Sequence, residues 1–128
     1  MKKLLLLCLL PVMLQGQARL NKSEEEIIEA FPEIKFKKGL TSDNLKYIMG
    51  DFPRGTFVYY FDEYNYTNLN IMVPYSIEKA NEQVEIYNGK YVIISKTSWN
   101  AYMDNGMIMK IDMIFDDEIN KFIFRYSL

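Results

Sequence analysis

The sequence predicts an α+β fold, in which an antiparallel sheet is packed by two short helices, arranged as a tandem α-β-β-β repeat. Three observations lead to this prediction. Two segments combine a capping serine with apolar residues at helical spacing. Several others alternate apolar and polar residues as strands do, and the two caps, Ser23 and Ser76, are 53 positions apart. The repeat halves would be residues 23–74 and 75–128; a simple meander that contains two unrelated helices is the alternative.

The first 18 residues have the pattern of a secretory signal peptide. Lys2 and Lys3 precede a short apolar run, and Gly16-Gln17-Ala18 fits a cleavage site, so we expect cleavage after Ala18 and export to the periplasm or the extracellular space. The apolar run is shorter than the roughly 20 residues that a membrane-spanning helix needs. Two alternatives are retention of the leader as an anchor and lipidation at Cys8, although the apolar run continues beyond that cysteine.

Residues 19–128 are expected to form a single α+β domain. This part of the chain contains neither cysteine nor histidine, which excludes internal disulfides, argues against a zinc site and leaves serine without a histidine base. It carries 13 basic and 17 acidic residues with no basic stripe, which argues against a nucleic-acid partner. We therefore expect no enzymatic activity, no cofactor, no metal and no membrane span after cleavage.

The first helix is expected to begin after Ser23. Residues 23–26 match a capping box, because Glu26 stands three residues after the capping serine. Ile27 and Ile28 begin its apolar face, and Pro32 ends it. The preceding residues 19–22 are expected to be a short flexible lead.

The strands of the first half are predicted from β-forming residues between turns. We expect them at residues 34–36, 45–49, 56–61 and 66–73. In the third of these, every second residue is aromatic and would face the core, so Val58 and Tyr60 would face outward.

The last strand of the first half shows a regular alternation. Leu69, Ile71 and Val73 share one face, and Asn70 lies on the other. An antiparallel sheet with one covered side usually places apolar residues on that side. The three apolar residues are therefore expected to face the core, with Asn70 exposed.

The second helix is expected to start after Ser76, with Pro74 keeping the incoming chain extended. Asn88-Gly89 fits its end, where glycine takes the left-handed conformation. Residues 91–94 follow without a polar interruption, which predicts a strand covered on both sides. The apolar helix face would consist of Ile77, Ala80, Val84 and Tyr87.

A hairpin is predicted at the end of the chain, after a turn at Asp104-Asn105-Gly106. Its first strand, residues 107–115, would direct three methionines, Ile111 and Phe115 to one face, and its second, residues 121–126, would direct Phe122, Phe124 and Tyr126 inward. Methionines form pliable apolar surfaces. This pattern favours core packing, with a small apolar-ligand (lipid-like) carrier as the alternative function.

The aromatic stretch of residues 59–66 offers a candidate interaction patch. Val58 and Tyr60 would lie on the outer sheet face, and Tyr64 and Tyr66 would continue it across the turn. Tyrosine is favoured at recognition surfaces because it combines a large ring with a polar tip. The alternative is that these are ordinary half-buried sheet tyrosines.

These features predict an exported, non-enzymatic binding or structural module that recognises a protein partner in the cell envelope or outside the cell. Carboxylates do gather at Asp62-Glu63 and at residues 116–118. An acid/base pair would need two of them to converge across a cleft. Both groups stand in predicted turns, where acidic residues are normally solvated, so they are not assigned a catalytic role.

Two resemblances extend this interpretation. The order of one helix and three strands, used twice, is similar to the layout of β-lactamase-inhibitor proteins and of BamE-like outer-membrane assembly lipoproteins. Residues 80–85, residues 91–95 and Trp99 resemble a segment found in small secreted proteins of gut bacteria, to which no activity is attached. Both resemblances imply a small exported α+β domain, and neither implies a reaction, because fold does not determine function.

Overall fold

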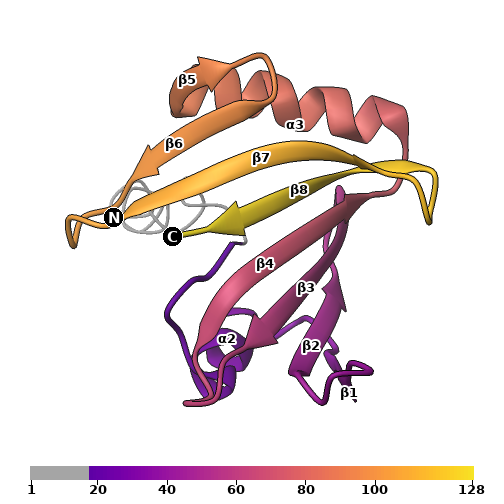
Figure 1. The fold of residues 1–128 in the computed structure, drawn as a ribbon, viewed down its shortest axis with the longest axis vertical. Coiled ribbons are helices and arrows are strands. Elements are labelled where there is room, and N and C mark those ends of the chain that lie inside the picture. Colours follow the sequence, from indigo (N-terminus) through magenta and orange to yellow (C-terminus); the bar gives the residue numbers. More distant parts are fainter. Residues whose placement is uncertain (1–17) are drawn as a thin grey trace, which may run out of the picture.

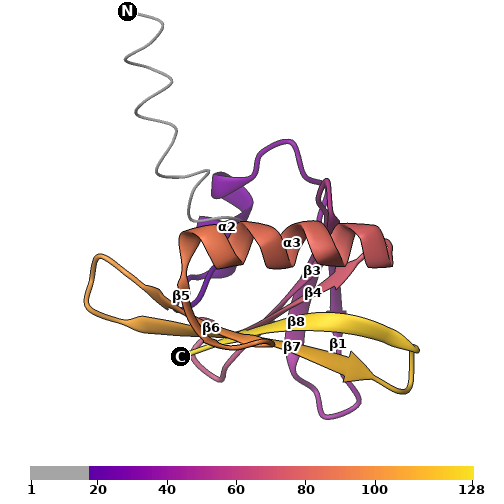
Figure 2. The same cartoon turned by 90° about the horizontal axis from the view of Figure 1, so that it is seen from above.

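The computed structural model describes residues 18–128 and confirms the α+β prediction. One antiparallel sheet of eight strands has the order β1-β2-β3-β4-β8-β7-β6-β5. Both helices lie on the same side of this sheet (Figure 2). The predicted signal peptide falls outside the described residues, apart from Ala18. The first-half elements are α2 (Glu24–Ala30), β1 (Lys37–Leu40), β2 (Lys46–Asp51), β3 (Gly55–Phe61) and β4 (Thr67–Pro74).

The second half of the chain has the same element order as the first. Each helix is followed by four strands, so the predicted order of one helix and three strands lacks one strand. The strand that was not predicted is β6, which contains Trp99. The strand predicted at residues 34–36 does not form there, and β1 lies just after it at Lys37–Leu40. The two halves join where β4 pairs with β8 at the centre of the sheet (Figure 1). The second-half elements are α3 (Ile77–Lys90), β5 (Val92–Ser95), β6 (Ser98–Tyr102), β7 (Ile108–Asp116) and β8 (Lys121–Ser127).

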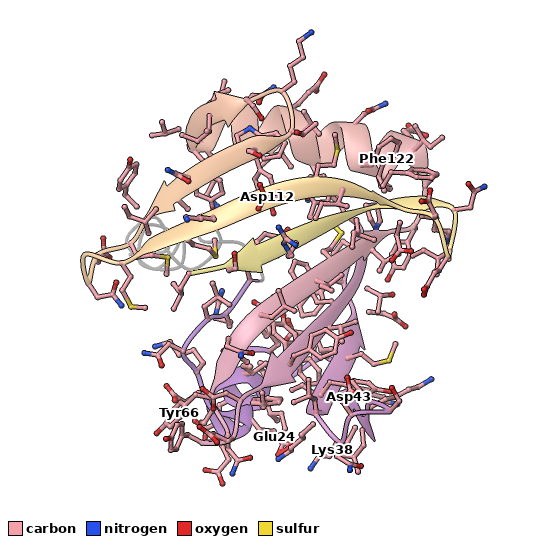
Figure 3. The ribbon with its side chains drawn as sticks, in the orientation of Figure 1. Glu24, Lys38, Asp43, Tyr66, Asp112 and Phe122 are labelled. Atoms are coloured by element: carbon pink, nitrogen blue, oxygen red, sulfur yellow. The ribbon has the colours of Figure 1, made fainter. Side chains whose placement is uncertain are left out.

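Helix α2 begins with the predicted capping box. The Ser23 hydroxyl accepts a hydrogen bond from the Glu26 amide, and the Glu26 carboxylate accepts one from the Ser23 amide, each at 3.2 Å. Ile27 is fully buried. At the same end of the helix, Glu24 pairs with Lys46 of β2 and Lys38 of β1, at 3.1 and 3.4 Å (Figure 3). These ion pairs tie the helix start to the edge of the sheet.

The lead that precedes α2 is not flexible, contrary to the prediction. The Asn21 amide donates to the Thr67 carbonyl at 2.7 Å, and the Thr67 amide donates to the Lys22 carbonyl at 2.9 Å. The Arg19 amide donates to the Asn70 side-chain carbonyl at 2.5 Å. The lead therefore runs beside the start of β4, before β8 takes over as its neighbour at Leu69.

Helix α3 extends past its predicted end. Gly89 lies within it, and Tyr91 forms the C-cap. Its buried residues are Ala80, Gln83 and Tyr87, whereas Ile77, which was expected on the apolar face, is 73% exposed. Gln83 is tolerated inside because its side chain contacts the Tyr87 hydroxyl.

The core is built largely from aromatic rings between α3 and the sheet. Tyr87 of α3 packs edge-on against Trp99 and Phe124, with ring centroids 5.7 Å apart in both pairs. The Trp99 indole N–H donates to the Asn88 side-chain carbonyl at 2.8 Å, so the tryptophan is buried without an unpaired donor. Phe57 stacks on Tyr126 across the sheet, which joins the two halves.

The prediction of strand faces succeeds for β3 and fails for β4. In β3 the residues alternate strictly, with Phe57, Tyr59 and Phe61 buried. In β4 the buried residues include Asn70 and Met72, so Leu69 and its apolar neighbours lie on the uncovered face. Asn70 faces the core because the Arg19 amide satisfies its carbonyl oxygen there.

Strand β5 is an edge strand and is not covered on both sides as predicted. Val92, Ile93 and Ile94 are 48%, 56% and 57% exposed, because β5 has a neighbouring strand on one side only. The opposite edge, β1, carries Lys37 and Lys38. The two edges of the sheet therefore differ in chemistry.

The inward face of the closing hairpin is only partly buried. Met109, Ile111, Phe124 and Tyr126 are buried as predicted. Phe115 and Phe122, by contrast, are 44% and 41% exposed. They face each other across β7 and β8, with ring centroids 5.1 Å apart, at the end of the sheet beside the start of α3 (Figure 3). Both stand on the predicted face, towards the start of α3, but the core ends before it reaches them and leaves them only partly buried.

Candidate functional site

The most extensive candidate site is the face of the sheet that carries no helix. Strand register places side chains there in rows that cross the sheet. One row places Tyr47 beside Tyr60 and Tyr60 beside Leu69, and the next places Met49 beside Val58 and Val58 beside Ile71. All are partly buried. We call this surface the outer-face patch; its residues are Tyr47, Met49, Val58, Tyr60, Leu69, Ile71 and Val73.

The same rows become polar where they pass into the second half of the sheet. Ile71 pairs with Arg125, which pairs with Asp112, which pairs with Ser98. The Arg125 guanidinium lies 3.5 Å from the Asp112 carboxylate, and the Ser98 hydroxyl donates to that carboxylate at 2.7 Å. The uncovered face is thus apolar over β2 to β4, and the two rows through Tyr60 and Val58 become polar over β8 to β6.

Tyr60 lies near the centre of the outer-face patch. Its ring centroid is 5.9 Å from that of Tyr47. Tyr47 in turn lies across Gly39 of β1, where a Cβ atom would overlap the tyrosine ring. Partial burial, together with the neighbouring Tyr47, raises the pKa of Tyr60. Tyr60 therefore remains a neutral hydroxyl that can donate or accept a hydrogen bond.

The four residues of the predicted interaction patch do not share one environment. Val58 and Tyr60 lie in adjacent rows of the outer-face patch. Tyr64 and Tyr66 belong to the β3–β4 turn and are 73% and 44% exposed. That turn is held by Asp62, whose carboxylate accepts hydrogen bonds from both tyrosine amides, at 2.9 and 3.1 Å. Figure 3 shows Tyr66 at the end of the molecule near Glu24.

Sequence reasoning missed most of the outer-face patch. Tyr47 and Met49 flank the buried Ile48, and this alternation in β2 was available as a signal. The residues of β4 were recognised as sharing a face, but the wrong face was chosen. An asparagine between apolar residues indicates the exposed side only if nothing in the core can bind it, and here the lead does so.

The acidic side chains of the turns accept hydrogen bonds from backbone amides of the same turn. In addition to the Asp62 turn, the Asp116 carboxylate accepts a hydrogen bond from the Glu118 amide at 2.9 Å. Within residues 18–128, no group of three or more acidic side chains could hold a metal ion. None of the helices in this part of the chain is both long enough and apolar enough to cross a membrane.

Two cavities lie away from the outer-face patch. The smaller, of about 260 Å³, is between the start of α3 and the end of the β7–β8 hairpin, where Ile77, Phe115 and Phe122 line it. The larger, of about 810 Å³, lies where the lead, the end of α3 and the β6–β7 turn meet. Lys90 and Arg19 are among its lining residues.

Comparison of the chain with protein-family models, with curated proteins and with solved structures gave no match. The similarity of layout to β-lactamase-inhibitor proteins and BamE-like lipoproteins therefore stays a prediction. The functional argument depends on the geometry of the chain itself.

Proposed function

We propose that the protein is an exported, non-enzymatic binding module that recognises a protein partner through the outer-face patch. The observation that supports this is the bare sheet face, on which apolar and aromatic residues lie side by side across three strands. Contiguous apolar surface of this kind is uncommon on proteins without a partner. Export is inferred from the leader sequence.

The uncovered face has an apolar area beside a polar one, and this arrangement supports a protein rather than a lipid surface as the partner. Protein interfaces combine an apolar, tyrosine-rich centre with a polar rim. Here the centre is the patch around Tyr60, and the rim is the ion pair of Arg125 and Asp112. A partner of matching chemistry has an apolar centre and, to one side, hydrogen-bonding groups that face this pair.

Site-specific photocrosslinking tests the proposal even while the partner is unidentified. A benzophenone side chain replaces Tyr60 in the exporting cell, and Lys110 is the matched control because it lies in the same sheet row on the polar half. We expect one discrete adduct from position 60 and none from position 110. Equal adducts at both positions, or none at position 60 in folded protein, would contradict the proposal.

A substitution then tests whether the patch is needed for binding. Tyr60→Ser should abolish capture of the crosslinked partner, whereas Lys110→Ser should not. Because Tyr60 is only partly buried, the melting temperature should change by a few degrees at most, in line with a loss of about 1 kcal/mol. Unchanged capture by Tyr60→Ser would show that the patch is not the binding surface.

We also infer that residues 23–74 and 75–128 are two copies of one unit. Both serine caps accept a hydrogen bond from the amide three residues later, and the strand order of one half mirrors that of the other about the β4–β8 pair. If so, residues 19–74 and 75–128 expressed as separate chains should reassemble through β4 and β8. Failure of the two chains to associate would count against this modular view.

A further inference from the structure

The cavity of about 810 Å³ has the size and lining of a ligand site. Its volume lies in the range of roughly 300–1,000 Å³ that is typical of such sites. Its walls come from segments far apart in the chain, namely the lead, the start of β5 and the β6–β7 hairpin. Most of the wall is apolar, and includes Leu20, Ala101, Met103, Met107, Met109 and Leu128.

Positive charge is concentrated at one part of this apolar wall. Lys90, the last residue of α3, and Arg19 of the lead both line the cavity. The Lys90 ammonium lies 5.0 Å from the Tyr91 ring, and the Arg19 guanidinium lies 4.9 Å from the Phe31 ring. The charge of Arg19 acts on Lys90, because it contributes to the lowering of the Lys90 pKa.

Among the residues that the structure describes, Lys90 lacks a counter-ion. Within residues 18–128, its ammonium has no carboxylate at ion-pair distance. Partial burial and the charge of Arg19 lower the pKa of Lys90 to about 8. An anion beside Lys90 would favour the protonated ammonium and would offset the repulsion from Arg19. Asp104 is the acidic residue that lines the cavity.

We propose that this cavity binds an acyl chain with a carboxylate head, such as a fatty-acid anion. The carboxylate pairs with Lys90 in the positive field of Arg19, and the chain lies along the methionines of the β6–β7 hairpin. Methionine suits this role because its flexible side chain adapts to chains of different length. The site is separate from the outer-face patch, so this inference does not depend on the proposed protein partner.

Binding of dodecanoate tests the inference, with protein purified after export of the full chain. Calorimetric titrations below the micelle concentration compare dodecanoate with dodecanol and dodecylammonium, which share the chain but differ in the head group. We expect dodecanoate to bind at least tenfold more tightly than either. Binding of all three with equal affinity would show an apolar carrier without head-group selection, and would overturn the proposal, as would no binding at all.

The variant Lys90→Met removes the charge and keeps an apolar stem. We expect dodecanoate affinity to fall at least tenfold while dodecanol affinity is unchanged. Lys96→Met is the matched control, because Lys96 is exposed in the β5–β6 turn and does not line the cavity. Unchanged dodecanoate binding by Lys90→Met, with near-ultraviolet circular dichroism showing a native core, would overturn the proposal.

A pH series provides a readout that misfolding would not mimic. As the pH rises above the pKa of Lys90, the free protein loses the ammonium and dodecanoate affinity should fall, whereas Lys90→Met should bind weakly without this dependence. The other titratable side chains that line the cavity are Arg19, Lys22, Tyr91, Tyr102 and Asp104. If the wild type and Lys90→Met showed the same pH dependence of dodecanoate affinity, that dependence would arise from one of these other groups, and the role of Lys90 would be overturned.

Discussion

The hydroxyl groups of Tyr87 and Tyr126 share a hydrogen bond in the centre of the core. Tyr87 comes from α3 and Tyr126 from the central strand β8, so this bond fixes the helix to the middle of the sheet. Tyr87 has a second polar contact, Gln83, from its own helix. Losing one partner therefore has different consequences for the two tyrosines.

Removing the Tyr87 hydroxyl should be more costly than removing that of Tyr126. Tyr87→Phe leaves the fully buried Tyr126 hydroxyl without a partner, which should lower the free energy of unfolding by about 1–3 kcal/mol. Tyr126→Phe should cost less, because Tyr87 keeps Gln83. The double variant should cost less than the sum. Urea unfolding followed by Trp99 fluorescence measures all three, and equal, additive losses would contradict this prediction.

The buried tyrosines should also make the fold sensitive to alkali. Burial raises the pKa of Tyr59, Tyr87 and Tyr126, and raises that of Tyr91 to about 12. In the unfolded chain these groups ionise near pH ~10. Above that pH the unfolded state releases protons that the folded state retains. The contribution of these tyrosines to the free energy of unfolding is therefore complete below pH ~10 and is lost as the pH rises towards the folded pKa values.

Urea unfolding at a series of pH values measures this effect. We expect the free energy of unfolding to be flat up to about pH 9 and to fall steeply beyond about pH 10. Tyr64→Phe is the matched control, because Tyr64 is exposed and its replacement should leave the steep part unchanged. A free energy that stays constant through this range would show that the core tyrosines do not titrate on unfolding.

Asn70 should be needed to hold the lead against β4. Its side-chain carbonyl accepts the Arg19 amide, so Asn70→Ala should cost about 1–3 kcal/mol and speed hydrogen exchange at the Asn21 and Thr67 amides. Asn68→Ala, two residues away on the exposed side, should change neither quantity. If Asn68→Ala and Asn70→Ala behaved alike, the lead would be held by its backbone pairing alone.

Local patterns were sufficient for the helix starts and for β3. Ser23 and Ser76 indicate the helix starts because a capping hydroxyl acts on amides within one turn. Phe57 and its alternating neighbours indicate the buried face of β3 because no polar residue interrupts them. Such signals come from residues that are neighbours in the chain, so tertiary structure does not alter them.

Other features depend on partners that are distant in the sequence. The orientation of Asn70 is decided by Arg19, 51 residues earlier, and the exposure of Ile93 is decided by the position of β5 at the end of the sheet. Gly89 lies inside α3, and Tyr91 rather than the glycine forms its C-cap. The candidate site was the least predictable feature, since the outer-face patch exists only once β2, β3 and β4 are in register.

The unequal sheet edges also limit how copies of this chain can join. Val92, Ile93 and Ile94 leave the β5 edge without charge, whereas Lys37 and Lys38 mark the β1 edge. Two molecules that met through β5 would present only lysine-bearing strands at both outer ends, where charge opposes further strand pairing. Association through β5 would therefore stop at a dimer, because the β1 edges that remain exposed do not favour the addition of further copies to form a fibre.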